Sequence, residues 1–202
     1  MNDREKTAEI LKRLQIMNTG FMADNFIKIP EFRLGSGYDG FSQQGIDLFA
    51  VSPNKSNRAV CFEIKVSRSD FKNDIKKEDK QTPARCFSNE FYYCTPKGLL
   101  KKEEVPVWAG LIEFDLEQEP QEDCYRYMNV HAVYVKKAPM FDKVQPTWGM
   151  IVSAYRNGFK QGCKSTPIER YKDGIISFEE LKQDERDWYR KKLKIIRRIQ
   201  KR

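Results

Sequence analysis

The sequence of 202 residues has a single histidine, His131, and five scattered cysteines with no CxxC pair. One histidine excludes most zinc hydrolases and any Ser-His-Asp enzyme that does not use His131 itself. The spacing of the cysteines is not that of a zinc site, and several lie in apolar stretches, so we expect buried free thiols. If the chain is an enzyme, its chemistry must rest on carboxylates and lysines.

Long apolar runs are also absent. No stretch approaches the roughly 18 apolar residues that a membrane-spanning helix needs, and the first residues contain no signal-peptide core. Hydrophobic residues make up 40% and charged residues 33%, a composition typical of a globular domain rather than a disordered chain. We therefore expect a soluble, cytoplasmic protein with no membrane partner.

The net charge of +8 is concentrated at one end. Residues 182–202 hold ten Lys or Arg against three Asp or Glu, which leaves 27 basic and 26 acidic residues before them. A basic terminal helix suits a polyanion partner. Its predicted DNA contacts are Arg190, Lys191, Lys194, Arg197 and Arg198. The alternative is a solvated helix face, which is a common cause of such charge runs.

The spacing of apolar residues predicts helices over residues 3–17 and from Ser67 to about Pro83. Strands are predicted at 26–32, 46–51, 59–66, 91–94, 108–114 and 128–135. This order indicates an α/β fold with a mixed central β-sheet flanked by helices. We expect one domain over residues 1–140 and a C-terminal extension over residues 141–202 that ends in the basic helix.

The most informative segment is a pair of strands joined by the turn at residues 52–57. In the second strand Glu63 and Lys65 lie on one face, and the alternating residues form a wholly apolar face that must enter a core. An antiparallel hairpin centred on Lys55 would place Asp47 directly across from Glu63. A slip of one residue would turn Asp47 to the other face.

Two opposed carboxylates repel each other unless a cation lies between them. Mg²⁺ typically takes one or two carboxylates together with water and phosphate oxygens, so Asp47 and Glu63 could bind it. Lys65 could then orient or deprotonate a water and stabilise charge on a phosphate. The alternative is an exposed sheet face with an ordinary Glu–Lys arrangement. Asp47 favours a site, because Asp is depleted in strands and costly to bury.

Asp47, a hairpin and Glu63-Ile-Lys65, with a helix before and after, resemble the PD-(D/E)XK nuclease superfamily. Ile46 stands where the proline that names the motif usually lies. Longer segments resemble the MmcB-like branch of DNA-repair nucleases within that superfamily. These segments are residues 63–74, 89–96, 105–112 and 133–139. The resemblance covers about residues 1–140.

This resemblance implies a restriction-endonuclease-like core that hydrolyses phosphodiester bonds of DNA with Mg²⁺, for which Mn²⁺ would substitute. Asp47, Glu63 and the backbone carbonyl of Ile64 would bind the metal. Lys65 would be the catalytic lysine, acting with Asp47 and Glu63. An endonuclease in DNA repair is the implied role, and a homodimer is possible in this fold because two strands must be cut.

The superfamily often adds a glutamate from the first helix and a polar residue from the second. Glu9 lies opposite the apolar stripe of its helix, so we leave it out of the site. Gln81 could be the polar residue, with a solvated glutamine as the alternative. The basic and acidic residues of the second helix are expected to form a salt-bridged exposed surface. They are Arg68, Asp70, Lys72, Asp74, Lys76, Lys77, Glu78, Asp79 and Lys80.

Two other functions stay open. One is a nucleic-acid-binding module that keeps the fold without catalysis, although an intact Asp47, Glu63 and Lys65 argues against it. The other is a protein-interaction or inhibitor role, in which the basic tail docks on an acidic partner. Binding to DNA that weakens steeply with salt would separate these two, because phosphate contacts release counterions.

Overall fold

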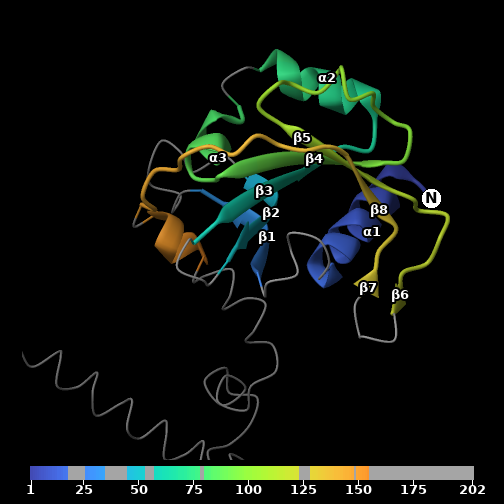
Figure 1. Ribbon diagram of the computed structural model, residues 1–202, viewed down its shortest axis with the longest axis horizontal. Helices are drawn as coiled ribbons and strands as arrows, with labels where there is room; N and C mark the ends of the chain where they lie inside the picture. The colour runs from blue at the N-terminus through green and yellow to red at the C-terminus, as the bar shows by residue number, and fades with distance from the viewer. Residues whose placement is uncertain are drawn as a thin grey trace, which may run out of the picture. The chain divides into compact units, whose positions relative to one another are not determined.

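The computed structural model describes residues 1–17, 26–34, 45–52, 57–77, 80–122, 128–147 and 149–154. The chain divides into two compact units, Met1–Asn157 and Gly158–Arg202, and the described residues all belong to the first. The five predicted DNA contacts between 190 and 198 therefore lie outside the described residues. Within the described part, a six-stranded sheet lies between helices on its two faces (Figure 1).

The strand order is β1-β2-β3-β4-β5-β8. The strands are β1 Ile27–Arg33, β2 Gly45–Val51, β3 Ala59–Ile64, β4 Glu90–Pro96, β5 Gly110–Phe114 and β8 Ala132–Lys136. β3, β4 and β5 pair in parallel, whereas the β1–β2, β2–β3 and β5–β8 pairs are antiparallel. The sheet is therefore mixed, and the predicted α/β class with helices flanking a mixed sheet is confirmed.

Helix α1, Asp3–Ile16, covers one face of the sheet. Asn2 begins it with a capping box, in which its side chain accepts from the N–H of Glu5 and the Glu5 carboxylate accepts from the N–H of Asn2. Ile10 and Leu14 are fully buried against the apolar face of β3, which includes Phe62. The predicted helix and the predicted apolar core face of β3 are both confirmed.

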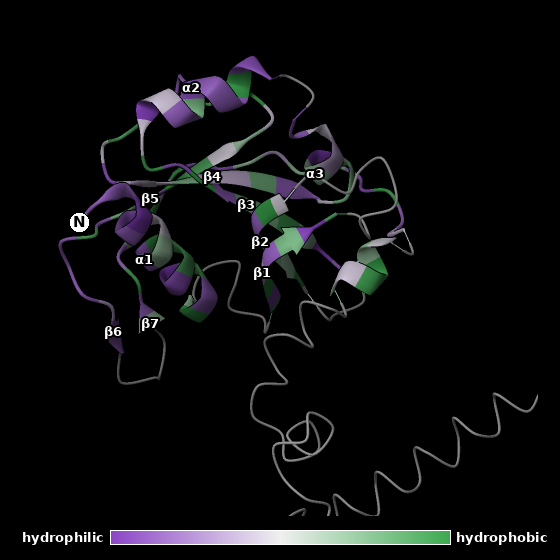
Figure 2. Cartoon of the chain, turned by 180° about the vertical axis from the view of Figure 1, so that it is seen from behind, coloured by the Kyte–Doolittle hydropathy of each residue, from purple (hydrophilic) through white to green (hydrophobic). Residues whose placement is uncertain are grey.

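Helices α2, Arg68–Lys76, and α3, Thr82–Cys86, cover the opposite face. Hydrophilic residues make up most of α2 (Figure 2), whereas its apolar residues Phe71 and Ile75 pack in the core on this face of the sheet. The expected single helix up to Pro83 is wrong. α2 ends at Lys76, and a second helix begins at Thr82 with Pro83 in its first turn, where the missing N–H costs nothing.

Because helices cover both faces, every residue of β3 is buried. Ala59 and Cys61, on the Glu63 side of the strand, pack in the same cluster as Phe71 of α2 and Ala84 of α3. The alternative interpretation of this side as an exposed sheet face is therefore wrong. Glu63 and Lys65 lie under α2 instead of facing solvent.

Two further details differ from the predicted elements. The strand expected at 128–135 is split into β7, Met128–Asn129, and β8, because His131 adopts a left-handed backbone with φ of 51°. β7 pairs with β6, Gln121–Glu122, in a separate two-stranded sheet for which the sequence analysis predicted no strand at residues 121–122. Of the described cysteines, Cys61 and Cys94 are buried free thiols as predicted, and Cys86 is exposed.

The chain beyond residue 140 continues to contact the sheet and its helices. The Phe141 N–H donates to the carbonyl of Asn89, and the Val144 N–H donates to the carbonyl of Cys86, at 2.9 and 2.8 Å. Met150, in a short helical segment at 149–154, is buried. No helix among the described residues is long and apolar enough to cross a membrane.

Candidate functional site

The β2–β3 pairing decides where Asp47 lies. Leu48 pairs with Phe62, which is the register of a hairpin centred on residue 55. One step further along both strands, Asp47 comes opposite Glu63, as predicted. Asp47 is half-buried, and its Oδ2 accepts a hydrogen bond of 2.6 Å from the N–H of Ile64. The register that the sequence analysis assumed is confirmed.

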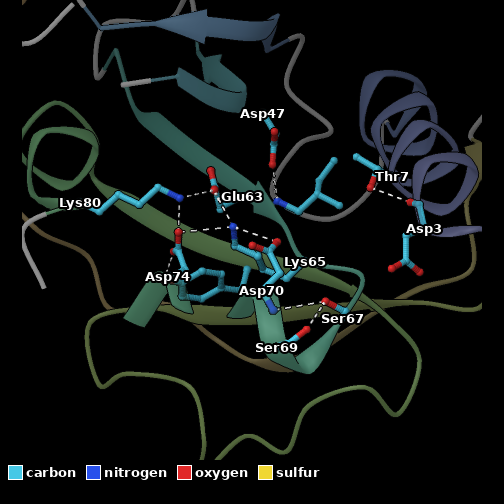
Figure 3. A network of polar contacts seen from close by, with 12 residues as sticks. Asp3, Thr7, Asp47, Glu63, Lys65, Ser67, Ser69, Asp70, Asp74 and Lys80 are labelled. Carbon is cyan, nitrogen blue, oxygen red and sulfur yellow. Dashed lines mark hydrogen bonds and ion pairs between the residues drawn. The ribbon is translucent and has the colours of Figure 1, made fainter. Parts of the chain in front are cut away.

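Lys65 follows directly after β3 and turns its amine back along the same face. Its Nζ lies 3.0 Å from Glu63 Oε1, 3.4 Å from Asp70 Oδ2 and 3.4 Å from Asp74 Oδ1 (Figure 3). The Lys65 N–H donates to the carbonyl of Cys94 at 2.9 Å, which holds the backbone beside β4. Lys65 and Glu63 are both buried. The predicted residues Asp47, Glu63 and Lys65 thus lie in one place.

Asp74 of α2 lies at the centre of the surrounding network. Its side chain has no exposed surface. Oδ2 accepts from Gln81 Nε2 at 2.9 Å and from the Tyr93 hydroxyl at 3.0 Å, whereas Oδ1 faces the amines of Lys65 and Lys80. The carboxylate is therefore fixed by donors from three other parts of the chain.

Lys80 brings a second amine to the same carboxylates. Its Nζ forms an ion pair with Asp74 Oδ1 and lies 3.6 Å from Glu63 Oε1, while 38% of its side chain remains exposed (Figure 3). The expectation that Asp74 and Lys80 belong to an exposed helix surface is wrong. The chain leaves the helix after Lys76 and returns Lys80 to the sheet face.

One signal in the sequence could have found Asp74. It lies three residues after Phe71 and one before Ile75, so it shares their stripe on the helix. Phe71 is buried and Ile75 packs against the core. An acid on the inner stripe of a helix needs partners there, and Lys65 and Gln81 supply them. No comparable signal marks Lys80, because its position depends on the turn between the two helices.

The two opposed carboxylates both hold their protons more tightly than usual. Burial raises the pKa of Asp47 above its ordinary value of 3.8, against the opposing effect of the Ile64 N–H. Burial, together with the negative charge of Asp47, raises the pKa of Glu63 from 4.5 to about 7, against the attraction of Lys65. Burial is therefore the main reason that both acids favour the protonated form, and the two nearby lysines only partly offset it.

The pKa values of Lys65 and Asp74 shift in the directions of a stable ion pair. Burial favours the neutral amine of Lys65, but Glu63 and Asp74 outweigh it and raise this pKa above its usual range. Burial alone would raise the pKa of Asp74, but hydrogen bonds from Lys80 and Gln81 outweigh it and lower this pKa. Lys65 is therefore an ammonium and Asp74 a carboxylate at neutral pH.

The charges of the site fit a divalent cation. Among the described residues, the acids Asp47, Glu63 and Asp74 face the lysines Lys65 and Lys80, so the fully ionised cluster carries one net negative charge. The oxygen donors of Asp47 and Glu63 suit a hard ion such as Mg²⁺, which commonly takes one or two carboxylates. Over the described ranges, no group of three or more His, Cys, Asp or Glu is arranged to hold a metal.

Of the remaining candidates, Gln81 belongs to the site and Glu9 does not. Gln81 is buried and donates to Asp74, so it joins the network and is not a solvated glutamine. Glu9 accepts from Arg13 Nε at 2.7 Å and lies 3.9 Å from the Lys12 amine, which agrees with leaving it out. The backbone of Ile64 meets the site through its N–H, which donates to Asp47.

Comparison with known proteins adds one structural likeness. No family model matches the chain, and no curated protein matches it. A solved structure of a protein of unknown function from Silicibacter pomeroyi is similar to it, with 16% sequence identity and a TM-score of 0.49. The alignment covers 88% of this chain and 98% of that one. Function is therefore inferred from the site itself.

Proposed function

We propose that the protein is a Mg²⁺-dependent nuclease that hydrolyses phosphodiester bonds of DNA as an endonuclease, with its site on a restriction-endonuclease-like core. The observation that supports this most directly is the meeting of Asp47, Glu63 and Lys65 across β2 and β3. Two opposed acids and a buried ammonium form the acid–acid–lysine set that the PD-(D/E)XK resemblance implies.

Asp47 and Glu63 would hold the metal with their carboxylates, together with the carbonyl of Ile64, and Mn²⁺ would substitute for Mg²⁺. When bound, such an ion would activate a water and neutralise charge on the phosphate. The raised pKa values of both acids support this assignment, because a divalent cation would favour the charged carboxylates that burial disfavours and, at Glu63, would also offset the negative charge of Asp47. Metal binding would release protons from the pair.

Lys65 is suited to donate hydrogen bonds more than to accept a proton. Its pKa lies above the usual range, since the attraction of Glu63 and Asp74 exceeds the effect of burial. A permanently charged amine on the Glu63 side of the site can orient a water and stabilise negative charge developing on a phosphate oxygen. Of the two roles open to Lys65, electrostatic stabilisation is therefore the one we propose.

The test is a cleavage panel of plasmid, single-stranded DNA, branched DNA and RNA with Mg²⁺ or Mn²⁺. The variants are Asp47→Asn, Glu63→Gln and Lys65→Met, with Lys76→Met as the control because Lys76 is an exposed lysine of α2. We expect metal-dependent cutting that falls by about 10² to 10⁴-fold in the three site variants and stays unchanged in the control. The nucleic acids in the panel that are cut identify the substrate class.

Two results would overturn the proposal. Absence of cleavage with every substrate and metal, together with DNA binding that all three variants retain, would favour a binding module without catalysis. Binding that ignores salt would point instead to a protein partner, because phosphate contacts weaken steeply with salt. Removing residues 182–202 should weaken DNA binding if the basic tail carries the phosphate contacts.

A further inference from the structure

We infer that Asp74 is the positioning residue of this site, and that it holds the amines of Lys65 and Lys80 against Glu63. The inference rests on the proposed function, because it assigns a role within the same site. Among the described residues, the hydrogen bonds and ion pairs of the Asp74 carboxylate do not include the proposed metal-binding acids Asp47 and Glu63. Its partners are the two lysines, Gln81 and Tyr93.

Two hydrogen bonds to Oδ2 fix the orientation of the Asp74 carboxylate. Oδ2 accepts from two neutral donors, Gln81 Nε2 at 2.9 Å and the Tyr93 hydroxyl at 3.0 Å. The Tyr93 ring is itself held by edge-on contacts with Phe71 and Phe91, whose ring centres lie 5.1 and 5.2 Å away. With Oδ2 engaged, Oδ1 is presented to the lysines, as Figure 3 shows.

The carboxylate of Glu63 is shared between the two lysines and the proposed metal site. Glu63 Oε1 is within 3.6 Å of both amines, so Glu63 forms ion pairs with the two lysines while it also lies opposite Asp47. If Glu63 turns its charge toward a bound cation, the lysines need another buried partner. A lysine has a long flexible stem, and an amine left without such a partner would move toward solvent. Asp74 can be that partner, because its carboxylate has no proposed role in metal binding.

Asp70 provides a matched control on the same lysine. Its Oδ2 lies 3.4 Å from Lys65 Nζ, which is the distance found for Asp74 Oδ1. The Asp70 side chain is 58% exposed, whereas that of Asp74 is 0% exposed. Solvent screens an exposed ion pair, so only the buried, anchored aspartate should hold the amine in place. Charge and distance are equal, and burial differs.

The experiment compares Asp74→Asn with Asp70→Asn in the full-length protein. Reductive methylation of the folded protein, read by mass spectrometry, reports the accessibility of Lys65 relative to the exposed Lys76. We expect Lys65 to be protected in the wild type and in Asp70→Asn, and several times more reactive in Asp74→Asn. We also expect kcat to fall by about 10 to 100-fold in Asp74→Asn, with KM unchanged, and by less than about fivefold in Asp70→Asn.

A second pair of variants covers the case in which Asp74→Asn does not fold. Tyr93→Phe keeps the packed ring and removes one donor to Asp74, so Lys65 should become more reactive. Tyr92→Phe is its control, because the hydroxyl of Tyr92 donates to Glu90 at 3.0 Å, and its ring packs with the α1-side core. We expect no change in Lys65 reactivity there.

Equal Lys65 reactivity in Asp74→Asn and Asp70→Asn, or in Tyr93→Phe and Tyr92→Phe, would overturn the inference. The methylation readout requires no substrate. If the wild type cleaves nothing, the proposed function fails while methylation still decides the role of Asp74. If the wild type cleaves DNA and Asp74→Asn is as active as Asp70→Asn, the nuclease stands and the positioning role fails.

Discussion

The wild type should become less stable as pH rises from about 4.5 to about 7, and the Glu63→Gln variant should lack this decrease. The pKa of Glu63 is raised from 4.5 to about 7 in the folded protein, mainly by burial and then by Asp47. Between these values the folded state binds more protons than the unfolded state. The free energy of unfolding therefore falls as pH rises, and the stabilisation present below pH 4.5 is lost above pH 7.

The magnitude follows from the size of the shift. One pKa unit corresponds to about 1.4 kcal/mol, so a shift from 4.5 to about 7 corresponds to about 3 kcal/mol. Only 7% of the Glu63 side chain is exposed, so solvent screens little of this effect. Asp74 acts in the opposite sense, but its pKa is lowered from 3.8, so the stability that it contributes is lost only below this window.

The assay is urea unfolding of both proteins at several pH values between about 4.5 and 8, without divalent metal. Glutamine stays neutral and keeps an oxygen that accepts from Lys65, so Glu63→Gln should gain stability relative to the wild type as pH rises. Glu103→Gln, at an exposed glutamate, controls for the loss of one carboxyl group. A difference between Glu63→Gln and wild type that is the same at every pH would refute the reasoning.

Three further predictions concern the metal and the fold. Above pH 7, Mg²⁺ at 100 times its Kd should raise the unfolding free energy of the wild type by about 3 kcal/mol and leave Asp47→Asn unchanged, measured by thermal denaturation. Gly110→Ala should cost about 1 to 3 kcal/mol in urea unfolding, because its Cβ would overlap the Tyr92 ring and lie 2.7 Å from the Ala138 nitrogen. Ser67→Ala should cost about 1 kcal/mol, because the Ser67 hydroxyl accepts from the first turn of α2, and hydrogen exchange should quicken there.

The hairpin shows how far local pattern reaches. Alternating apolar residues in β3 and the turn cluster before it suggested a hairpin centred on residue 55, and the pairing of Leu48 with Phe62 confirms this assumed register. Turn length determines register in a hairpin, and side chains alternate strictly along a strand, so both features are local in the chain. The helical stripe of α1 and the N-cap at Ser67 are local in the same way.

The second helix shows where local pattern ends. In the sequence, its charges are typical of a solvated surface. In the structure, the Asp74 side chain is fully buried, and Lys80 contacts it on the Glu63 side of the sheet after the helix has ended. Whether a charged side chain faces solvent or a sheet depends on which elements pack together. That packing joins residues distant in the chain, such as Asp74 and Tyr93.

The sequence alone thus determined the first helix, the order of the six sheet strands and the shared face of Glu63 and Lys65, because helical periodicity and strand alternation are properties of neighbouring residues. Only the tertiary structure decided that this face is covered by α2, that Gln81 is buried, and that two lysines share the carboxylates of Glu63 and Asp74. Those outcomes depend on burial, which sets both the strength of the ion pairs and the pKa values, and burial belongs to the packed chain as a whole.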